Sequence, residues 1–241
     1  MTPTRTSTTG NFPWRMVYAY GGYTIISWLV ALAFLLVAVL LVNSLNTGIP
    51  ESLGSAWFYL SSVGSWFAAG AAGYMAYWTA PIYVTHGHTR REAMRDGVIT
   101  LAVLALLITV ILIVSFLLEY ALFGTLGWTR TIPESRLFAS HLDIFGMIND
   151  FLPMILMLAA GGALVGAFTY RYESWGWLSF IPALGLVFAY TILGENSLGL
   201  FRPELYTGAT AVLMRWLSAL LTAGIFLAVT WLAVRRVPIR S

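Results

Sequence analysis

The chain has 241 residues, of which 59% are hydrophobic and only 10% are charged, whereas about a quarter of the residues in a soluble domain are charged. This composition excludes a water-soluble globular protein, because too few polar side chains remain to cover its surface, and it makes lipid the expected solvent. The formal net charge of +3 is too small to indicate a nucleic-acid partner, and the lack of cysteine excludes disulfides and thiolate chemistry.

The N-terminal segment is expected to lie outside the membrane. Residues 1–11 are rich in Thr and have no apolar core, so they predict a disordered tail rather than a cleaved signal peptide. In residues 12–21, Phe12, Trp14 and Tyr20 alternate with Arg15 and glycine, a pattern that favours a short interfacial amphipathic helix. A plain juxtamembrane anchor explains the same pattern equally well.

Residues 22–234 predict one all-α membrane domain with six transmembrane helices, followed by a cytoplasmic tail at residues 235–241. Each of six apolar stretches is long enough to cross about 30 Å of hydrocarbon at a rise of about 1.5 Å per residue. The expected spans are Gly22–Asn43, Ser55–Val84, Val98–Phe123, Asn149–Tyr170, Trp177–Gly194 and Gly208–Val234.

The distribution of arginine predicts the orientation. With the N-terminus inside, nine of the thirteen arginines lie on the cytoplasmic side and four on the outer side. The cytoplasmic set is Arg5, Arg15, Arg90, Arg91, Arg95, Arg171, Arg235, Arg236 and Arg240. The positive-inside rule then favours both ends in the cytoplasm, in a multi-pass protein of the cell membrane, either a bacterial inner membrane or a plasma membrane.

The loop between the second and third spans has the clearest local signal. Thr89 and Glu92 have the Thr-x-x-Glu spacing of a capping box, in which each side chain accepts a hydrogen bond from the other's backbone N–H. Gly97 is a favourable C-terminal stop. The loop therefore predicts a rigid, Arg-rich helix of about two turns on the cytoplasmic face. Such a helix either docks a cytoplasmic partner or only orients the protein by its charge.

Gly87-His88-Thr89-Arg90-Arg91-Glu92-Ala93, together with the order and length of the spans, resembles the ABC-2-type transporter permeases. The resemblance covers nearly the whole chain, although His86 and His88 depart from its pattern and receive no role. It implies a coupling helix that docks a separate ATP-binding-cassette subunit. That element would comprise Gly87, His88, Thr89, Arg90, Arg91, Glu92, Ala93, Met94, Arg95 and Asp96. Arg171 and Glu173, in the next cytoplasmic turn, would form a second contact.

The same resemblance implies export of an amphiphilic or peptide-like compound by two permease copies, or by one copy and a homologue. ATP and Mg²⁺ would bind to the partner ATPase, and this chain would hold no cofactor. The resemblance also implies a short re-entrant outer segment, for which Glu195, Leu200 and Phe201 are the gate candidates. An ordinary outer loop with membrane-dipping side chains explains these residues as well.

The second span is rich in small and hydroxyl residues. Tyr59, Ser62, Trp66 and Gly73 fall on one helical stripe, and Gly162 and Gly166 form a small-residue pair in the fourth span. Small residues let helices approach closely in lipid, so packing within or between protomers is the simpler interpretation. The alternative is that Tyr59, Ser62 and Trp66 line a substrate pathway at a dimer interface.

Three ionisable residues lie within or beside the spans: Glu119, Asp150 and Arg215. All are close to the outer interface, so snorkelling or mutual pairing is expected, and Glu195 with Arg215 is a conceivable pair. Charged groups that are truly buried in a bilayer would instead mark a functional site.

We expect no catalytic site. The sequence has no lysine and therefore no Walker motif, and His86 and His88 lack the further ligands of a metal site. Two alternatives to a permease remain, a non-transporting accessory or immunity protein and an intramembrane enzyme.

Overall fold

The chain folds into an antiparallel helical bundle, seen in a computed structural model that describes residues 13–44, 52–54, 56–126, 129–131, 137–138, 140, 142–195 and 207–235. The helical elements are α1 (Trp14–Ser44), α2 (Ala56–Tyr74), the π-helical η1 (Met75–Thr79), α3 (Ala80–Thr85), α4 (Arg90–Leu126), α5 (Ile144–Tyr172), the 3-10 helix η2 (Glu173–Ser179), α6 (Phe180–Glu195) and α7 (Gly208–Val234). Two strands of three residues, β1 (Ser52–Gly54) and β2 (Thr129–Thr131), pair in parallel.

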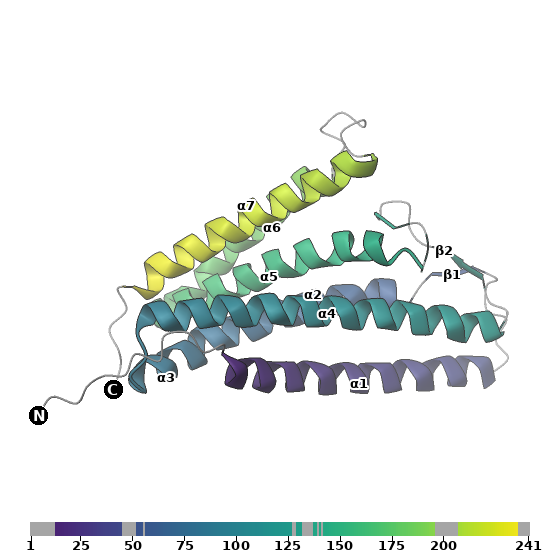
Figure 1. Ribbon diagram of the computed structural model, residues 1–241, viewed down its shortest axis with the longest axis horizontal. Coiled ribbons are helices and arrows are strands. Elements are labelled where there is room, and N and C mark those ends of the chain that lie inside the picture. Colours follow the sequence, from purple (N-terminus) through teal and green to yellow (C-terminus); the bar gives the residue numbers. More distant parts are fainter. Residues whose placement is uncertain are drawn as a thin grey trace, which may run out of the picture.

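The helices run back and forth along the bundle. Five helical segments are long and apolar enough to cross a membrane: Trp14–Phe34, Arg90–Leu122, Ile144–Tyr172, Trp175–Leu193 and Gly208–Val234. The expected span Ser55–Val84 corresponds to α2, η1 and α3, which follow one another without a break. Because the chain reverses after each pass, the start of α1 and the end of α7 lie toward the same end as α3 (Figure 1).

We call this end the arginine-rich end, because Arg15, Arg90, Arg91, Arg171 and Arg235 lie at the helix termini gathered there. The strands β1 and β2 lie at the opposite end, where α7 diverges from α1 and α4 in Figure 1. The positively charged termini are therefore separated from the β1–β2 end by the full length of the bundle.

The expectation of a separate interfacial helix at residues 12–21 is wrong for the described part of that segment. α1 begins at Trp14 and continues through Gly21 without a break. The reason is packing against the bundle: Met16 is buried, and the hydroxyl oxygens of Tyr20 and Thr79 are hydrogen-bonded at 2.6 Å. These first turns therefore belong to the bundle. Residues 1–12, with the expected disordered tail, lie outside the described residues.

Helix α5 is the central element of the bundle. It packs against α2, α4 and α7, and most of its side chains from Gly146 to Ala167 are buried. One apolar cluster joins it to α2 and α4 and includes Phe116, Phe138 and Phe151, whose rings lie within 5.7 Å of one another, centroid to centroid. A second cluster joins it to α6 and α7 around Phe226.

The contact between α2 and α5 depends on glycine. A Cβ on Gly162 would overlap the backbone of Ala69, and a Cβ on Gly166 would overlap that of Gly73. The two backbones therefore touch, as the small-residue interpretation predicts, and the contact lies within a single chain.

The outer surface of the bundle is apolar. On α1, Tyr18, Leu29 and Phe34 are exposed, and on α6 Ile181 and Phe188 are exposed. A soluble protein rarely leaves such large contiguous apolar faces open to water. The surface is compatible with a helical membrane protein whose α1 and α6 face lipid.

Replacing Gly162 with alanine should destabilise the protein, because the new methyl group would push α2 away from α5. We expect a loss of about 1–3 kcal/mol in the free energy of unfolding, measured by thermal unfolding of the purified protein in detergent. Gly185→Ala is the matched control, since nothing lies near a Cβ at that position on α6. Equal unfolding midpoints for the two variants would contradict the tight contact.

Candidate docking site and buried polar groups

The turn between α3 and α4 forms the predicted capping box. The Thr89 N–H donates to Glu92 Oε2 at 2.7 Å, and the Glu92 N–H donates to Thr89 Oγ1 at 3.2 Å. Gly87 has a φ of +92°, a conformation that favours glycine and turns the chain into α4. The hydrogen bond from the Thr89 N–H holds the pKa of the partly exposed Glu92 carboxyl below its ordinary value. The loop is thus fixed at the first turn of α4.

The expected two-turn helix that ends at Gly97 is wrong. α4 starts at Arg90 and passes through Gly97 as one helix of 37 residues. An interior glycine costs about 1 kcal/mol relative to alanine, and the long apolar run from Val98 onward is itself helical, so the glycine does not end the helix. The docking candidates Arg90 to Asp96 are therefore the first turns of a membrane-length helix rather than a separate element.

The arginines of this segment have different surroundings. Arg91 is exposed on the first turn. Arg95 forms an ion pair with its neighbour Asp96, in which Nε and Nη2 each lie 2.9 Å from the same oxygen, Oδ1. Ala93 is buried and Met94 is half-buried, so the segment presents charge on one side and packs into the bundle on the other.

Two further arginines bind the C-terminal end of α7. Arg90 donates to the carbonyl oxygen of Arg235 at 2.6 Å, and Arg171 donates to that of Ala233 at 3.1 Å. The last carbonyls of a helix have no partners within it and carry partial negative charge, so guanidinium groups stabilise them. These two contacts tie the start of α4 and the end of α5 to the end of α7.

The two histidines contact their own turn. His86 Nδ1 lies 2.8 Å from the Ile82 carbonyl oxygen, and the ring of His88 stacks on Tyr83 with centroids 4.2 Å apart. His88 Nδ1 also lies 4.0 Å from Glu92 Oε2. These contacts of His86 and His88 fix the shape of the turn between α3 and α4.

The second predicted contact lies beside the first. Arg171, whose guanidinium carbon lies 5.0 Å from the centre of the Tyr172 ring, is in the last turn of α5. Glu173 follows with a φ of +49°, which is uncommon for a residue with a Cβ, and it is exposed. The structure thus brings the two predicted contacts to one end of the bundle, joined through α7.

The pathway candidates on α2 have different surroundings. Gly73 packs on α5, whereas Trp66 is exposed and lines a groove between α2, α5 and α6 together with Tyr74 and Trp78. The side chains of Tyr59 and Ser62 lie outside the described residues. Among the outer gate candidates, Glu195 is the last residue of α6, and Leu200 and Phe201 lie outside the described residues.

A buried ion pair joins α5 and α7 in the half of the bundle farther from the arginine-rich end. Arg215 pairs with Asp150, and their exposed fractions are 3% and 0%. Next to it, Trp216 Nε1 donates to Asn149 Oδ1 at 2.8 Å. Mutual pairing is therefore confirmed for Arg215 and Asp150, whereas the side chain of Glu195 lies outside the described residues. Glu119 on α4 is also buried, at 2% exposed. Its position near the outer end of the third span did not predict this burial.

Comparisons with protein-family models, curated proteins and solved structures find no match for this chain. The fold itself defines a class: a helical bundle with five helices long and apolar enough to cross a membrane, compatible with a membrane protein.

Breaking the buried ion pair should be costly. Asp150→Leu leaves a buried cation and Arg215→Met a buried anion, so we expect each to lose about 3–5 kcal/mol of stability. The double variant should lose less than the sum, because neither charge remains buried alone. Denaturant unfolding of the four proteins in detergent measures the cycle, and additive losses would contradict the pairing.

The capping box should respond to acid. The pKa of Glu92 is lower in the folded protein than in the unfolded chain, so its ionised carboxylate stabilises the fold. This stabilisation is fully present above the unfolded pKa of about 4.3 and is lost as the pH falls through the folded pKa. Hydrogen-exchange protection at the first turn of α4, corrected for intrinsic rates, should therefore fall at acid pH. The variant Glu92→Gln does not titrate, so an equal fall in that variant would contradict the assignment.

Proposed function

We propose that the chain is the membrane-spanning permease subunit of an ATP-driven transporter of the ABC-2 type, energised by a separate ATP-binding-cassette subunit. The observation that carries this proposal is the capped start of α4. A tether between two spans needs no fixed geometry, yet reciprocal hydrogen bonds hold this turn, and the exposed Arg91 lies in the first turn of a membrane-length helix.

The architecture supports a coupling role for this end. A partner that binds Arg91 acts directly on α4, whose first residue is bonded to the end of α7. α7 is bonded in turn to Arg171 of α5. A push at the capped turn therefore moves the ends of three helices together rather than bending a loop.

The energy source lies on another chain. The sequence has no lysine and so no Walker motif, and ATP and Mg²⁺ would bind to the partner subunit. The start of α1 and the end of α7 lie at the arginine-rich end (Figure 1). Together with the positive-inside rule, this arrangement supports an N-in, C-in orientation with the arginine-rich end in the cytoplasm of a bacterial inner or plasma membrane. Two copies, or one copy and a homologue, would enclose the pathway of an exported amphiphilic or peptide-like compound.

Reversing the charge of Arg91 tests the docking role. Arg90 and Glu92 are unsuitable for this test, because each makes a hydrogen bond that holds the fold. Glu92 accepts from the Thr89 N–H, and Arg90 donates to the Arg235 carbonyl oxygen. We expect Arg91→Glu to weaken association with the proposed ATP-binding-cassette subunit about tenfold, equivalent to about 1.4 kcal/mol, and to abolish stimulation of ATP hydrolysis in vesicles. Co-purification and hydrolysis rates measure the two effects.

Arg15→Glu is the matched control, because Arg15 is exposed at the same end on α1. Equal effects of the two variants would show that charge alone matters and would contradict docking at α4. If the wild-type chain neither co-purifies with the ATPase nor stimulates it, the chain is instead a non-transporting accessory or immunity protein.

A further inference from the structure

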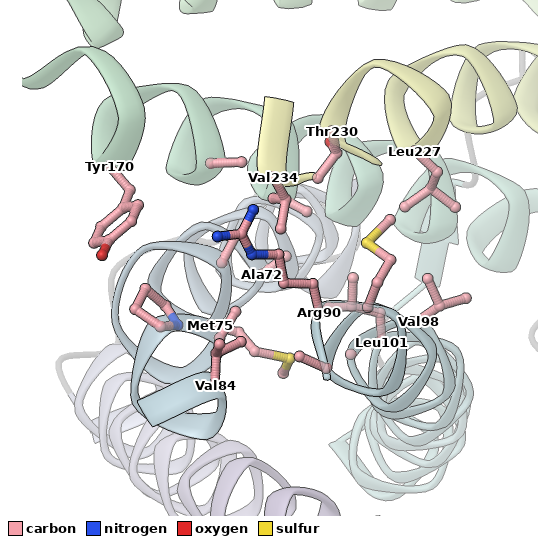
Figure 2. Close-up of a pocket in the computed structure, with 18 of the residues that line it drawn as sticks. Ala72, Met75, Val84, Arg90, Val98, Leu101, Tyr170, Leu227, Thr230 and Val234 are labelled. Atoms are coloured by element: carbon pink, nitrogen blue, oxygen red, sulfur yellow. The ribbon is translucent and has the colours of Figure 1, made fainter. Parts of the chain in front are cut away.

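The interior of the bundle leaves little space near the arginine-rich end. Figure 2 shows Met75, Leu101 and Leu227 around a cavity between η1, α4 and α7. The volume of this cavity is about 80 Å³, whereas sites for organic ligands measure about 300–1,000 Å³. A ligand with a hydrocarbon chain therefore does not fit in it, and larger spaces lie on the outer side of the bundle.

One such space is a groove of about 730 Å³ between α1 and the segment formed by α2 and η1. On α1 its wall is the stripe Arg15, Ala19 and Tyr23, exposed residues that are four apart and so lie on one helix face. Tyr74 on α2 lies across from this stripe and is also exposed. The groove therefore opens toward the outside of the bundle, where lipid would lie. The rest of the α2 wall is made of Phe67, Gly70 and Ala71.

Two contacts between α1 and the opposite wall fix the shape of the groove. The hydroxyl oxygens of Tyr20 and Thr79, which both line it, are hydrogen-bonded at 2.6 Å. Farther along α1, Trp28 packs against Gly64, where an added Cβ would lie 2.8 Å from the indole ring. Between these two contacts α2 presents Gly70, and nothing lies within 4 Å of a Cβ at that position. The groove is thus a product of the packing of α1.

Arg15 places a positive charge at the end of the groove nearer the arginine-rich end. It is the one residue with a formal charge among the described residues that line the groove. Its guanidinium makes no hydrogen bond or ion pair in the described part of the chain, whereas those of Arg90, Arg95 and Arg171 do. The five N–H donors of Arg15 are therefore available to an anion.

The length of the groove matches one leaflet of a bilayer. From Arg15 to Tyr23 it extends about 12 Å along α1, at about 1.5 Å per residue. The hydrocarbon layer of a bilayer is about 30 Å thick, so one leaflet contributes about 15 Å. A lipid whose head group lies at Arg15 therefore has its acyl chain beside the apolar part of the groove.

We propose that this groove binds an anionic phospholipid from the leaflet at the arginine-rich end. The phosphate pairs with the Arg15 guanidinium, whose planar fork suits two parallel hydrogen bonds, and one acyl chain lies against Ala19 and Gly70. The second chain stays in the surrounding bilayer, because the groove is open on that side. Arg91 and Arg95 are exposed at the same end and add positive potential, which a zwitterionic head group, with its own cation, exploits less well.

This lipid site is separate from the candidate docking segment. Binding of a lipid requires no ATPase, so the inference does not rest on the proposed transport function. In vesicles of zwitterionic lipid the groove has no anionic occupant, and Arg15→Glu therefore remains a control for docking at α4.

The test uses the full chain in phosphatidylcholine nanodiscs that contain a small amount of one photoreactive probe. The probe is phosphatidylglycerol or phosphatidylcholine, each with the same diazirine in one chain, and peptides covering residues 15–23 and 67–74 report labelling in the groove. We expect phosphatidylglycerol to label these peptides about fivefold more, the scale of one arginine near an anionic lipid. Arg15→Gln should remove this preference, and Arg15→Lys should keep most of it. Arg91→Gln, at the same end but outside the groove, should keep all of it.

A second pair of variants separates the groove from general contact with lipid. Ala19→Phe fills the groove and should reduce labelling of residues 67–74 by both probes, whereas Ala33→Phe, exposed farther along the same helix, should reduce neither. Both positions are exposed, so both variants should fold, and unchanged labelling of α6 by the phosphatidylcholine probe checks that they do.

The proposal is overturned if the two probes label the groove of the wild type equally, or if Arg91→Gln removes the preference as Arg15→Gln does. It is also overturned if Ala19→Phe has no effect. Because the chain has no cysteine, Ala19→Cys introduces a single thiol. A disulfide-linked dimer of that variant in vesicles would show that a second copy, rather than a lipid, covers the groove.

Discussion

The direct backbone contact between α2 and α5 organises the bundle. Gly162 and Gly166 allow α5 to lie against Ala69 and Gly73 with no side chain between them. In lipid, where apolar surface is not driven together as it is in water, such close approach supplies van der Waals packing that larger residues would prevent. With α2 on one side, α5 has its other faces available to α4 and α7, and the two apolar clusters form around it.

Polar contacts then fix α7 against this centre at two levels. Arg90 and Arg171 bind its last carbonyls, and toward its other end Asp150 and Asn149 bind Arg215 and Trp216. Polar bonds between helices in a low-dielectric surrounding are specific because a mismatched partner leaves a buried group unsatisfied. Apolar packing around Phe226 alone would tolerate sliding of α7 along α5, whereas these four contacts define one register.

The features that depend on local spacing are predictable from the sequence. The capping box of Thr89 and Glu92 requires only two residues that are three positions apart. Gly162 and Gly166 are four positions apart and so lie on one helix face, which predicts a close helix–helix contact. The apolar run of α7 is long and clear, so its expected bounds agree with the observed ones. The predicted end of the candidate docking helix at Gly97 is wrong, because a glycine stops a helix only when the residues after it cannot continue the helix. The apolar run from Val98 onward does continue it.

The partners of the charged groups could not be read from the sequence. Asp150 and Arg215 are 65 positions apart, and their meeting depends on the rotation and register of two helices, which the sequence leaves open. Likewise, the positive-inside rule counts Arg90 and Arg171 as charges that orient the chain, yet in the folded protein their guanidinium groups cap a third helix.

The length of α4 has a mechanical consequence. Its 37 residues extend over roughly 55 Å at about 1.5 Å per residue, whereas the hydrocarbon layer of a bilayer is about 30 Å thick. In a bilayer the excess is absorbed by tilt or by protrusion into the head-group region. The helix is continuous through Gly97, so in a bilayer a displacement of its first turn would change the tilt of the whole helix. The thickness of that bilayer would in turn affect the position of the arginine-rich end.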